Sequence, residues 1–123
     1  MQNQNSKSKV ELRERAYKYV IRMIKFLDGI ENSKTSGVII NQLTRSATSV
    51  GANLVEAKGA SSRKDFTNFV CHSLKSANES LFWLGLLRDA KDIHNNELNT
   101  LLKETQELAN ILASSVITLK GRN

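Results

Sequence analysis

The cations near the start of this sequence have a regular spacing that suits contact with a chain of phosphates. They recur at intervals of three, four and three residues, which brings them to one side of a helix, as Arg15, Lys18, Arg22 and Lys25. Arg13 flanks this row, and Tyr17 and Tyr19 are near enough to offer stacking surfaces. Such charges attract a phosphate backbone and release its condensed counterions, which gives salt-sensitive binding without sequence preference. The alternative is a solvated helix face that keeps the protein soluble.

The distribution of charge points to the same part of the chain. The formal net charge is +6, and seven of the 18 Lys and Arg residues fall in the first 30 positions, against three acidic residues there. The hypothesis that follows is a basic first helix in contact with RNA or DNA.

A second polar set follows one flank of an apolar helix face. Its members lie three, four, four and three residues apart, as Gln42, Arg45, Ser49, Asn53 and Glu56. Short hydroxyl and amide groups with one Arg and one Glu indicate side chains hydrogen-bonded against another helix or another copy of the chain. Ser76 and Glu79 can complete the set from a later helix, and we expect Arg45 to pair with Glu79. We favour a structural polar network, with a ligand pocket as the alternative.

The sequence lacks the patterns of catalytic and metal sites. Neither His72 nor His94 has a metal-ligand partner of the expected kind three or four residues away, since the sequence contains no H-x-x-x-H or E-x-x-H. Cys71 and His72 are sequence neighbours about 100° apart on a helix, so they do not form a nucleophile–base pair. There is no Gly-rich phosphate loop, nucleophile elbow or catalytic carboxylate pair. The expectation is a protein that is not an enzyme and holds neither a metal nor a cofactor.

Apolar periodicity predicts four helices joined by short connections within one domain. The expected bounds are 8–28, 36–58, 63–90 and 95–120, after a disordered tail over 1–7. Ser8 and Ser62 each have an acidic residue three positions later, which is the spacing of a capping box. The chain has no proline. Four long helices with short loops form an all-α, antiparallel up-down-up-down bundle.

The second half of the third helix is apolar in several directions at once. Its expected inner stripe consists of Phe66, Val70, Leu74, Ala77, Leu81 and Leu84. Four further apolar side chains point elsewhere, namely Phe82, Trp83, Leu86 and Leu87. A helix that is apolar all round is normally buried all round, so these four predict a subunit interface. A groove for a different protein is the alternative.

The expected location is the cytoplasm. The longest apolar run spans seven residues, against the ~20 needed to cross a bilayer. No apolar segment follows the polar N-terminus, and one cysteine cannot make an internal disulfide. No membrane partner is expected.

Two motifs carry a family resemblance that covers most of the chain. The first has the pattern Q-L-x-R-[SA]-x-x-S-[IV]-x-A-N-[IL]-x-E, matched by Gln42, Leu43, Arg45, Ser46, Ser49, Val50, Ala52, Asn53, Leu54 and Glu56. The second is K-x-F-x-x-F followed by S-x-x-E, matched by Lys64, Phe66, Phe69, Ser76 and Glu79. With them the chain resembles the four-helix bundle proteins of the ribosomal-RNA intervening-sequence family. It departs from the family's usual pattern at Gly51, where proline is common, and at Ala57, where glycine is common.

The resemblance implies an antiparallel bundle that assembles as a ring, typically a homopentamer. The chain also looks like the accessory variability proteins of diversity-generating retroelements, which share the bundle and bind nucleic acid and a reverse transcriptase. The family has no established enzymatic activity and supplies no catalytic residues. The expected function is a homo-oligomeric scaffold whose first helix contacts RNA or DNA backbone. The alternative is a protein-interaction or purely structural oligomer without a nucleic-acid role.

Overall fold

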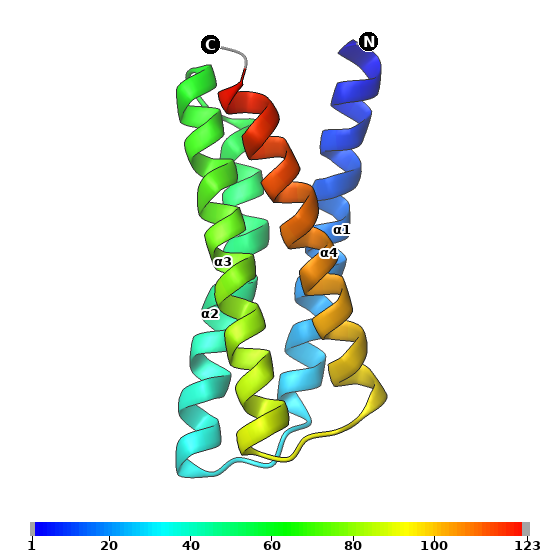
Figure 1. Cartoon of the computed structure of the whole chain (residues 1–123), viewed down its shortest axis with the longest axis vertical. Helices are drawn as coiled ribbons and strands as arrows, with labels where there is room; N and C mark the ends of the chain where they lie inside the picture. Colours follow the sequence, from blue (N-terminus) through cyan, green and yellow to red (C-terminus); the bar gives the residue numbers. More distant parts are fainter. Residues whose placement is uncertain (1, 122–123) are drawn as a thin grey trace.

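Four long helices make up the computed structural model of this protein, which describes residues 2–121, with side chains from Lys9 onward. They are α1 (Gln2–Asp28), α2 (Lys34–Lys58), α3 (Arg63–Ala90) and α4 (Asn96–Lys120), and residues 2–121 contain no strand. In Figure 1 the chain reverses direction at each connection, so that the start of α1 and the end of α4 lie at the same end of the molecule. The predicted all-α, four-helix fold is confirmed.

Side-chain caps explain where three of the helices begin. Ser33 forms a capping box with Ser36 at the start of α2, Ser62 accepts a hydrogen bond from the amide of Asp65 in α3, and Asn95 caps α4. Each cap satisfies a backbone amide that lacks a partner within its helix. The cap at Ser33 explains why α2 starts at Lys34, two residues before the predicted position.

The structure differs most from expectation at the start of α1. This helix begins at Gln2, so residues 2–7 extend it, in place of the expected tail, and Ser8 is not its cap. None of the first 28 residues is glycine or proline, so nothing in the sequence stops a helix from extending backward once the later turns have formed. Met1, the first residue of the expected tail, lies outside the described residues.

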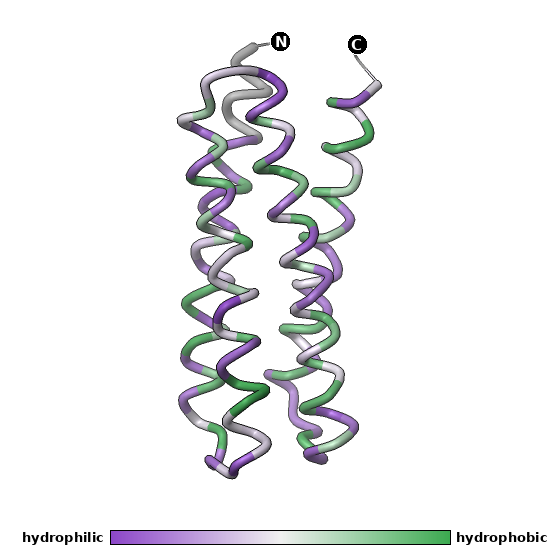
Figure 2. Tube along the Cα trace, turned by 90° about the vertical axis from the view of Figure 1, so that its left-hand side faces the viewer, coloured by the Kyte–Doolittle hydropathy of each residue, from purple (hydrophilic) through white to green (hydrophobic). Residues whose placement is uncertain are grey.

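The core is built from apolar side chains of all four helices. Its largest fully buried members are Tyr19, Met23, Leu43, Leu84, Leu87, Leu98, Leu101, Leu108 and Leu112. Burying one such leucine contributes about 1.5–3 kcal/mol relative to leaving it exposed. Figure 2 shows hydrophobic and hydrophilic residues alternating along the helices. Within residues 2–121, no helix is long and apolar enough to cross a membrane.

The face that α3 turns to the core is rotated from the predicted one. Ser73, Ser80 and Leu87 are buried, while Leu74 and Leu81 are only partly buried. The small hydroxyl side chains allow α2 and α3 to approach closely, and these two helices share the most extensive interface of the bundle. The predicted stripe gave weight to hydrophobicity alone and therefore missed the serines.

The side-chain hydrogen bonds between α1 and α4 join the second half of α1 to the first half of α4. Residues 15, 19 and 22 of α1 contact residues 104, 105 and 97 of α4, respectively. Toward the start of α1 the two helices diverge, which is visible in Figure 1. Their interface is the smallest between neighbouring helices.

Candidate functional site

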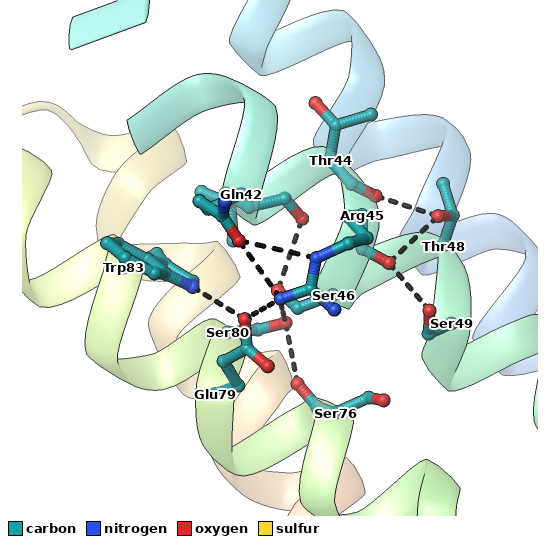
Figure 3. A network of polar contacts seen from close by, with 11 residues as sticks. Gln42, Thr44, Arg45, Ser46, Thr48, Ser49, Ser76, Glu79, Ser80 and Trp83 are labelled. Carbon is teal, nitrogen blue, oxygen red and sulfur yellow. Dashed lines mark hydrogen bonds and ion pairs between the residues drawn. The ribbon is translucent and has the colours of Figure 1, made fainter. Parts of the chain in front are cut away.

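Arg45 stands at the centre of a polar cluster between α2 and α3 (Figure 3). Its guanidinium forms an ion pair with Glu79 and donates a hydrogen bond of 3.0 Å to Gln42 Oε1. The indole Nε1 of Trp83 donates to the same Glu79 carboxylate at 2.9 Å. The pair is the one expected from the sequence, but it is not buried, because the side chains of Arg45 and Glu79 are 57% and 35% exposed. An ion pair so exposed contributes about 0.2–1 kcal/mol.

The side chains of the other members of the predicted network contact neither the Arg45 guanidinium nor the Glu79 carboxylate. The Ser49 hydroxyl donates to the Arg45 carbonyl at 2.8 Å, and the Asn53 amide donates to the Ser49 carbonyl at 2.9 Å. Both bonds join a side chain to the carbonyl one turn earlier in the same helix, so they do not connect α2 with α3. The Ser76 carbonyl accepts a hydrogen bond of 2.9 Å from the Ser80 hydroxyl. Glu56 is exposed and has no hydrogen-bond or ion-pair partner for its side chain among residues 9–121.

The fully buried polar contacts involve hydroxyl groups that the sequence analysis did not select. Ser46 and Ser80 share a hydrogen bond of 2.8 Å between α2 and α3, and the Ser73 hydroxyl donates to the Val50 carbonyl at 2.8 Å. Within residues 9–121, no buried side-chain N or O atom lacks a partner. Such satisfied contacts hold the helices together and leave none of these buried hydroxyl groups free for a ligand. The spacing of four and three residues from Ser73 through Ala77 to Ser80 could have revealed them.

The row of cations on α1 is divided by its contacts with α4. Arg15 binds Glu104 with two hydrogen bonds, of 2.7 Å from Nε and 2.6 Å from Nη2, and its Nη2 lies 3.7 Å from Glu107. Arg22 binds Glu97 at 2.6 Å. The hydrogen bond from Arg15 holds the pKa of the Glu104 carboxyl below its ordinary value. These two arginines are therefore neutralised by carboxylates of the same chain and are poor candidates for phosphate contact.

The remaining cations of the predicted set differ in their surroundings. Lys18 and Lys25 are exposed and have no ion-pair partner among residues 9–121. Arg13 is partly buried and lines a cavity at one end of the bundle. Of the two tyrosines expected to offer stacking surfaces, Tyr17 is exposed, with 69% of its surface accessible. Tyr19 is buried, and its hydroxyl shares a hydrogen bond of 2.8 Å with the Thr105 hydroxyl. Burial raises the pKa of Tyr19 to about 12.

The predicted subunit interface on α3 loses one of its four residues. Leu87 is fully buried in the core, because the inward line of α3 passes through Ser80, Leu84 and Leu87. Phe82 is 58% exposed and meets Trp83 edge to face, with ring centroids 4.9 Å apart. We call Phe82 and the partly buried Trp83 and Leu86 the α3 cluster.

A second exposed apolar surface, which the sequence analysis did not identify, lies on α1. It consists of Val10, Tyr17, Ile21 and Ile24, and we call it the α1 stripe. The intervals of seven, four and three residues place all four on one side of the helix. Ile24 lies outside the buried line of α1, which passes through Ala16, Tyr19, Met23 and Leu27.

The residues considered for nucleophilic or metal chemistry are dispersed. His72 is exposed on α3, next to the partly buried Cys71. His94 lies in the connection before α4, with its Nε2 at 3.8 Å from Asp92 Oδ1. Within residues 2–121, no three or more His, Cys, Asp or Glu residues are grouped as a metal site would require.

Comparisons with known proteins agree with this architecture. Residues 8–114 match the family model described as 23S rRNA-intervening sequence protein. The fold is similar to the crystal structure, at 1.70 Å resolution, of a Bacteroides thetaiotaomicron protein of unknown function from the S23 ribosomal protein family. The TM-score is 0.78 at 30% sequence identity, and the alignment covers 85% of this chain and 97% of that one. No curated protein matches the sequence.

Proposed function

The chain belongs to the 23S rRNA-intervening sequence protein family, and from that membership we propose that it is a non-enzymatic scaffold that assembles with copies of itself. The proposed assembly is a closed ring of antiparallel up-down-up-down bundles. Five subunits is the number that the family resemblance implies. The observation that carries the proposal is the presence of two separate apolar surfaces on one small bundle, the α1 stripe and the α3 cluster.

The positions of these two surfaces favour a head-to-tail contact. Each of α1 and α3 packs against α2 and α4, and the two do not pack against each other, so they are diagonal in the bundle. A two-fold contact of one surface with itself would leave the other exposed to water. If the α1 stripe of one copy covers the α3 cluster of the next, a single kind of contact buries both. Repetition of such a contact produces a ring when the rotation between copies closes.

The test is to restore assembly by mixing two variants that cannot assemble alone. Tyr17→Glu places a charge in the α1 stripe and Phe82→Glu places one in the α3 cluster, in both cases at an exposed helical position. Each variant should be monomeric by light scattering. An equimolar mixture should form a dimer, because each partner retains one intact surface.

The matched control is Ile117→Glu on α4, whose side chain is 73% exposed and belongs to neither surface. This variant should assemble like the wild type. A monomeric wild type at tens of micromolar would refute self-assembly, and a mixture that stays monomeric would refute the head-to-tail contact.

Contact with RNA or DNA backbone is the second candidate function. The supporting observation is that Lys18 and Lys25 remain exposed on α1 without ion-pair partners in the described part of the chain. A ring would present these lysines several times, and such repetition raises avidity. Because Arg15 and Arg22 are held by glutamates, the contact would rest on fewer charges than the sequence suggests.

A fluorescent single-stranded RNA would test this second candidate at about 50 and 300 mM salt, since backbone contacts weaken steeply as salt rises. Replacement of Lys18 and Lys25 by Gln should abolish binding at low salt. Replacement of Lys64 and Lys75 on α3 by Gln removes an equal charge elsewhere and should not. Absence of binding by the wild type at low salt would leave a scaffold without a nucleic-acid role.

A further inference from the structure

A cavity of about 560 Å³ lies near the end of the bundle where α1 begins. All four helices contribute to its walls, and it lies where α1 and α4 diverge in Figure 1. Its apolar lining consists of Leu12, Leu54, Phe66, Val70, Ile111 and Leu119. The volume falls in the range of roughly 300–1,000 Å³ that is typical of small-molecule sites.

The sequence explains why side chains do not fill this space. In the middle of the bundle α4 contributes Leu101, Leu108 and Leu112 to the core, but one turn beyond Leu112 the corresponding position is Ser115. On α2 one of the two lining residues is the small Ala57. On α1 the inward-facing line continues from the buried Ala16 through the partly buried Leu12 to the exposed Lys9, which keeps its ammonium group near the surface. Small and charged residues at core positions therefore leave room between the helices.

The charged side chains that line the cavity are both cationic. Lys9 and Arg13 lie one turn apart on α1, and no acidic residue lines the cavity. The Lys9 ammonium lies 4.6 Å from the centroid of the Phe66 ring, a cation–π distance. The wall formed by α4 adds uncharged hydrogen-bonding groups from Asn110, Ser114, Ser115 and Thr118. An apolar floor with two cations at one side is complementary to a molecule with an apolar tail and an anionic head.

We propose that this cavity binds a single-chain carboxylate amphiphile, a fatty acid of medium length. The alkyl chain lies among the apolar side chains, and the carboxylate accepts hydrogen bonds from Lys9 and Arg13. Charge-assisted hydrogen bonds of this kind fix the orientation of the head, and burial of the tail supplies affinity. A nucleotide is a poorer match, because its sugar and several charges would meet an apolar floor to which residues 9–121 add no further cation.

Displacement of a fluorescent fatty acid, dansylaminoundecanoate, from the full chain tests the proposal. Dodecanoate below its micelle-forming concentration should displace the probe. Butanoate, which lacks the tail, and dodecyltrimethylammonium, which has the opposite charge, should not. If the wild type does not bind the probe, or if the cationic amphiphile competes as well as dodecanoate, the proposal is wrong.

Variants then locate the site. Lys9→Gln and Arg13→Gln should each weaken dodecanoate binding about tenfold, as expected for loss of one charged hydrogen bond. Ser115→Phe should abolish binding by filling the cavity, with helical content followed by circular dichroism. Lys103→Gln on α4 removes the same charge away from the cavity and should bind normally. Equal weakening by Lys103→Gln would show nonspecific attraction and overturn the assignment.

This inference does not depend on self-assembly. Light scattering on the same samples separates the two proposals, because a monomer that binds dodecanoate would refute the scaffold and support the cavity.

Discussion

The ion pairs of Arg15 and Arg45 are similar in kind but differ in their exposure to water, and we expect them to differ in their contribution to stability. Both guanidinium groups bind a carboxylate on a neighbouring helix, Glu104 in one case and Glu79 in the other. The first contact has two good hydrogen bonds and a carboxylate that is only 23% exposed, whereas the second is more open to water. We therefore expect the α1–α4 pair to contribute more to stability than the α2–α3 pair.

The lowered pKa of Glu104 predicts how stability depends on pH. Because the folded-state pKa lies below the ordinary value of 4.5, this carboxyl stabilises the fold above that value. The contribution is lost as the pH falls through the folded-state pKa. Urea unfolding of the wild type and of Glu104→Gln should show a difference that is largest near neutral pH and shrinks in acid. A difference independent of pH would contradict the pair.

Glu79→Gln should have a small effect on stability because its ion pair is exposed. Loss of the charge weakens the contact with Arg45 by about 0.2–1 kcal/mol, while the Gln oxygen can still accept the Trp83 indole hydrogen bond. Thermal unfolding measures the first effect and Trp83 fluorescence reports the second. A loss above about 3 kcal/mol would be the behaviour of a buried pair. An unchanged melting temperature would show that the contact does not contribute to stability.

At the scale of the elements, the sequence predicted the number and class of the helices because their apolar periodicity is strong. The contact of Arg45 with Glu79 was also predictable, since a lone Arg on a polar flank requires a carboxylate. The orientation of α3 was not, because Ser73 and Ser80 are buried through hydrogen bonds that depend on the partner helix. The glutamates that neutralise Arg15 and Arg22 were missed for a similar reason. Glu97 and Glu104 lie seven residues apart on α4 and face α1 only once the register is known.

Gly85 offers a test of packing at this scale. A Cβ atom at this position of α3 would meet no heavy atom within 4 Å. Gly85→Ala should therefore raise the free energy of unfolding by about 0.5–1 kcal/mol, through the higher helix propensity of alanine. Urea unfolding measures the change. Gly51→Ala is the companion variant, because its Cβ would lie 3.5 Å from Val20 Cγ2, an ordinary contact, and it should also be tolerated. A loss of stability at Gly85 would indicate that a second copy covers this face.

At the scale of the whole molecule, the unequal interfaces predict unequal local stability. The helices α2 and α3 share the largest interface and the buried serine contacts, whereas α1 and α4 share the smallest. Amide hydrogen exchange should therefore be slowest in the middle of α2 and α3 and fastest near the start of α1. A uniform pattern of protection along all four helices would contradict this ranking.

The start of α1 and the end of α4 lie at the same end of the bundle. This proximity has a consequence for the order in which the helices can follow one another along the chain. Each helix contacts the next, and α4 contacts α1, so the packing forms a closed cycle of four. The packing of the helices would therefore be unchanged if the end of α4 were joined covalently to the start of α1. A circular permutant that joins these two by a flexible linker and opens the chain in the connection between α2 and α3 keeps every interhelical contact.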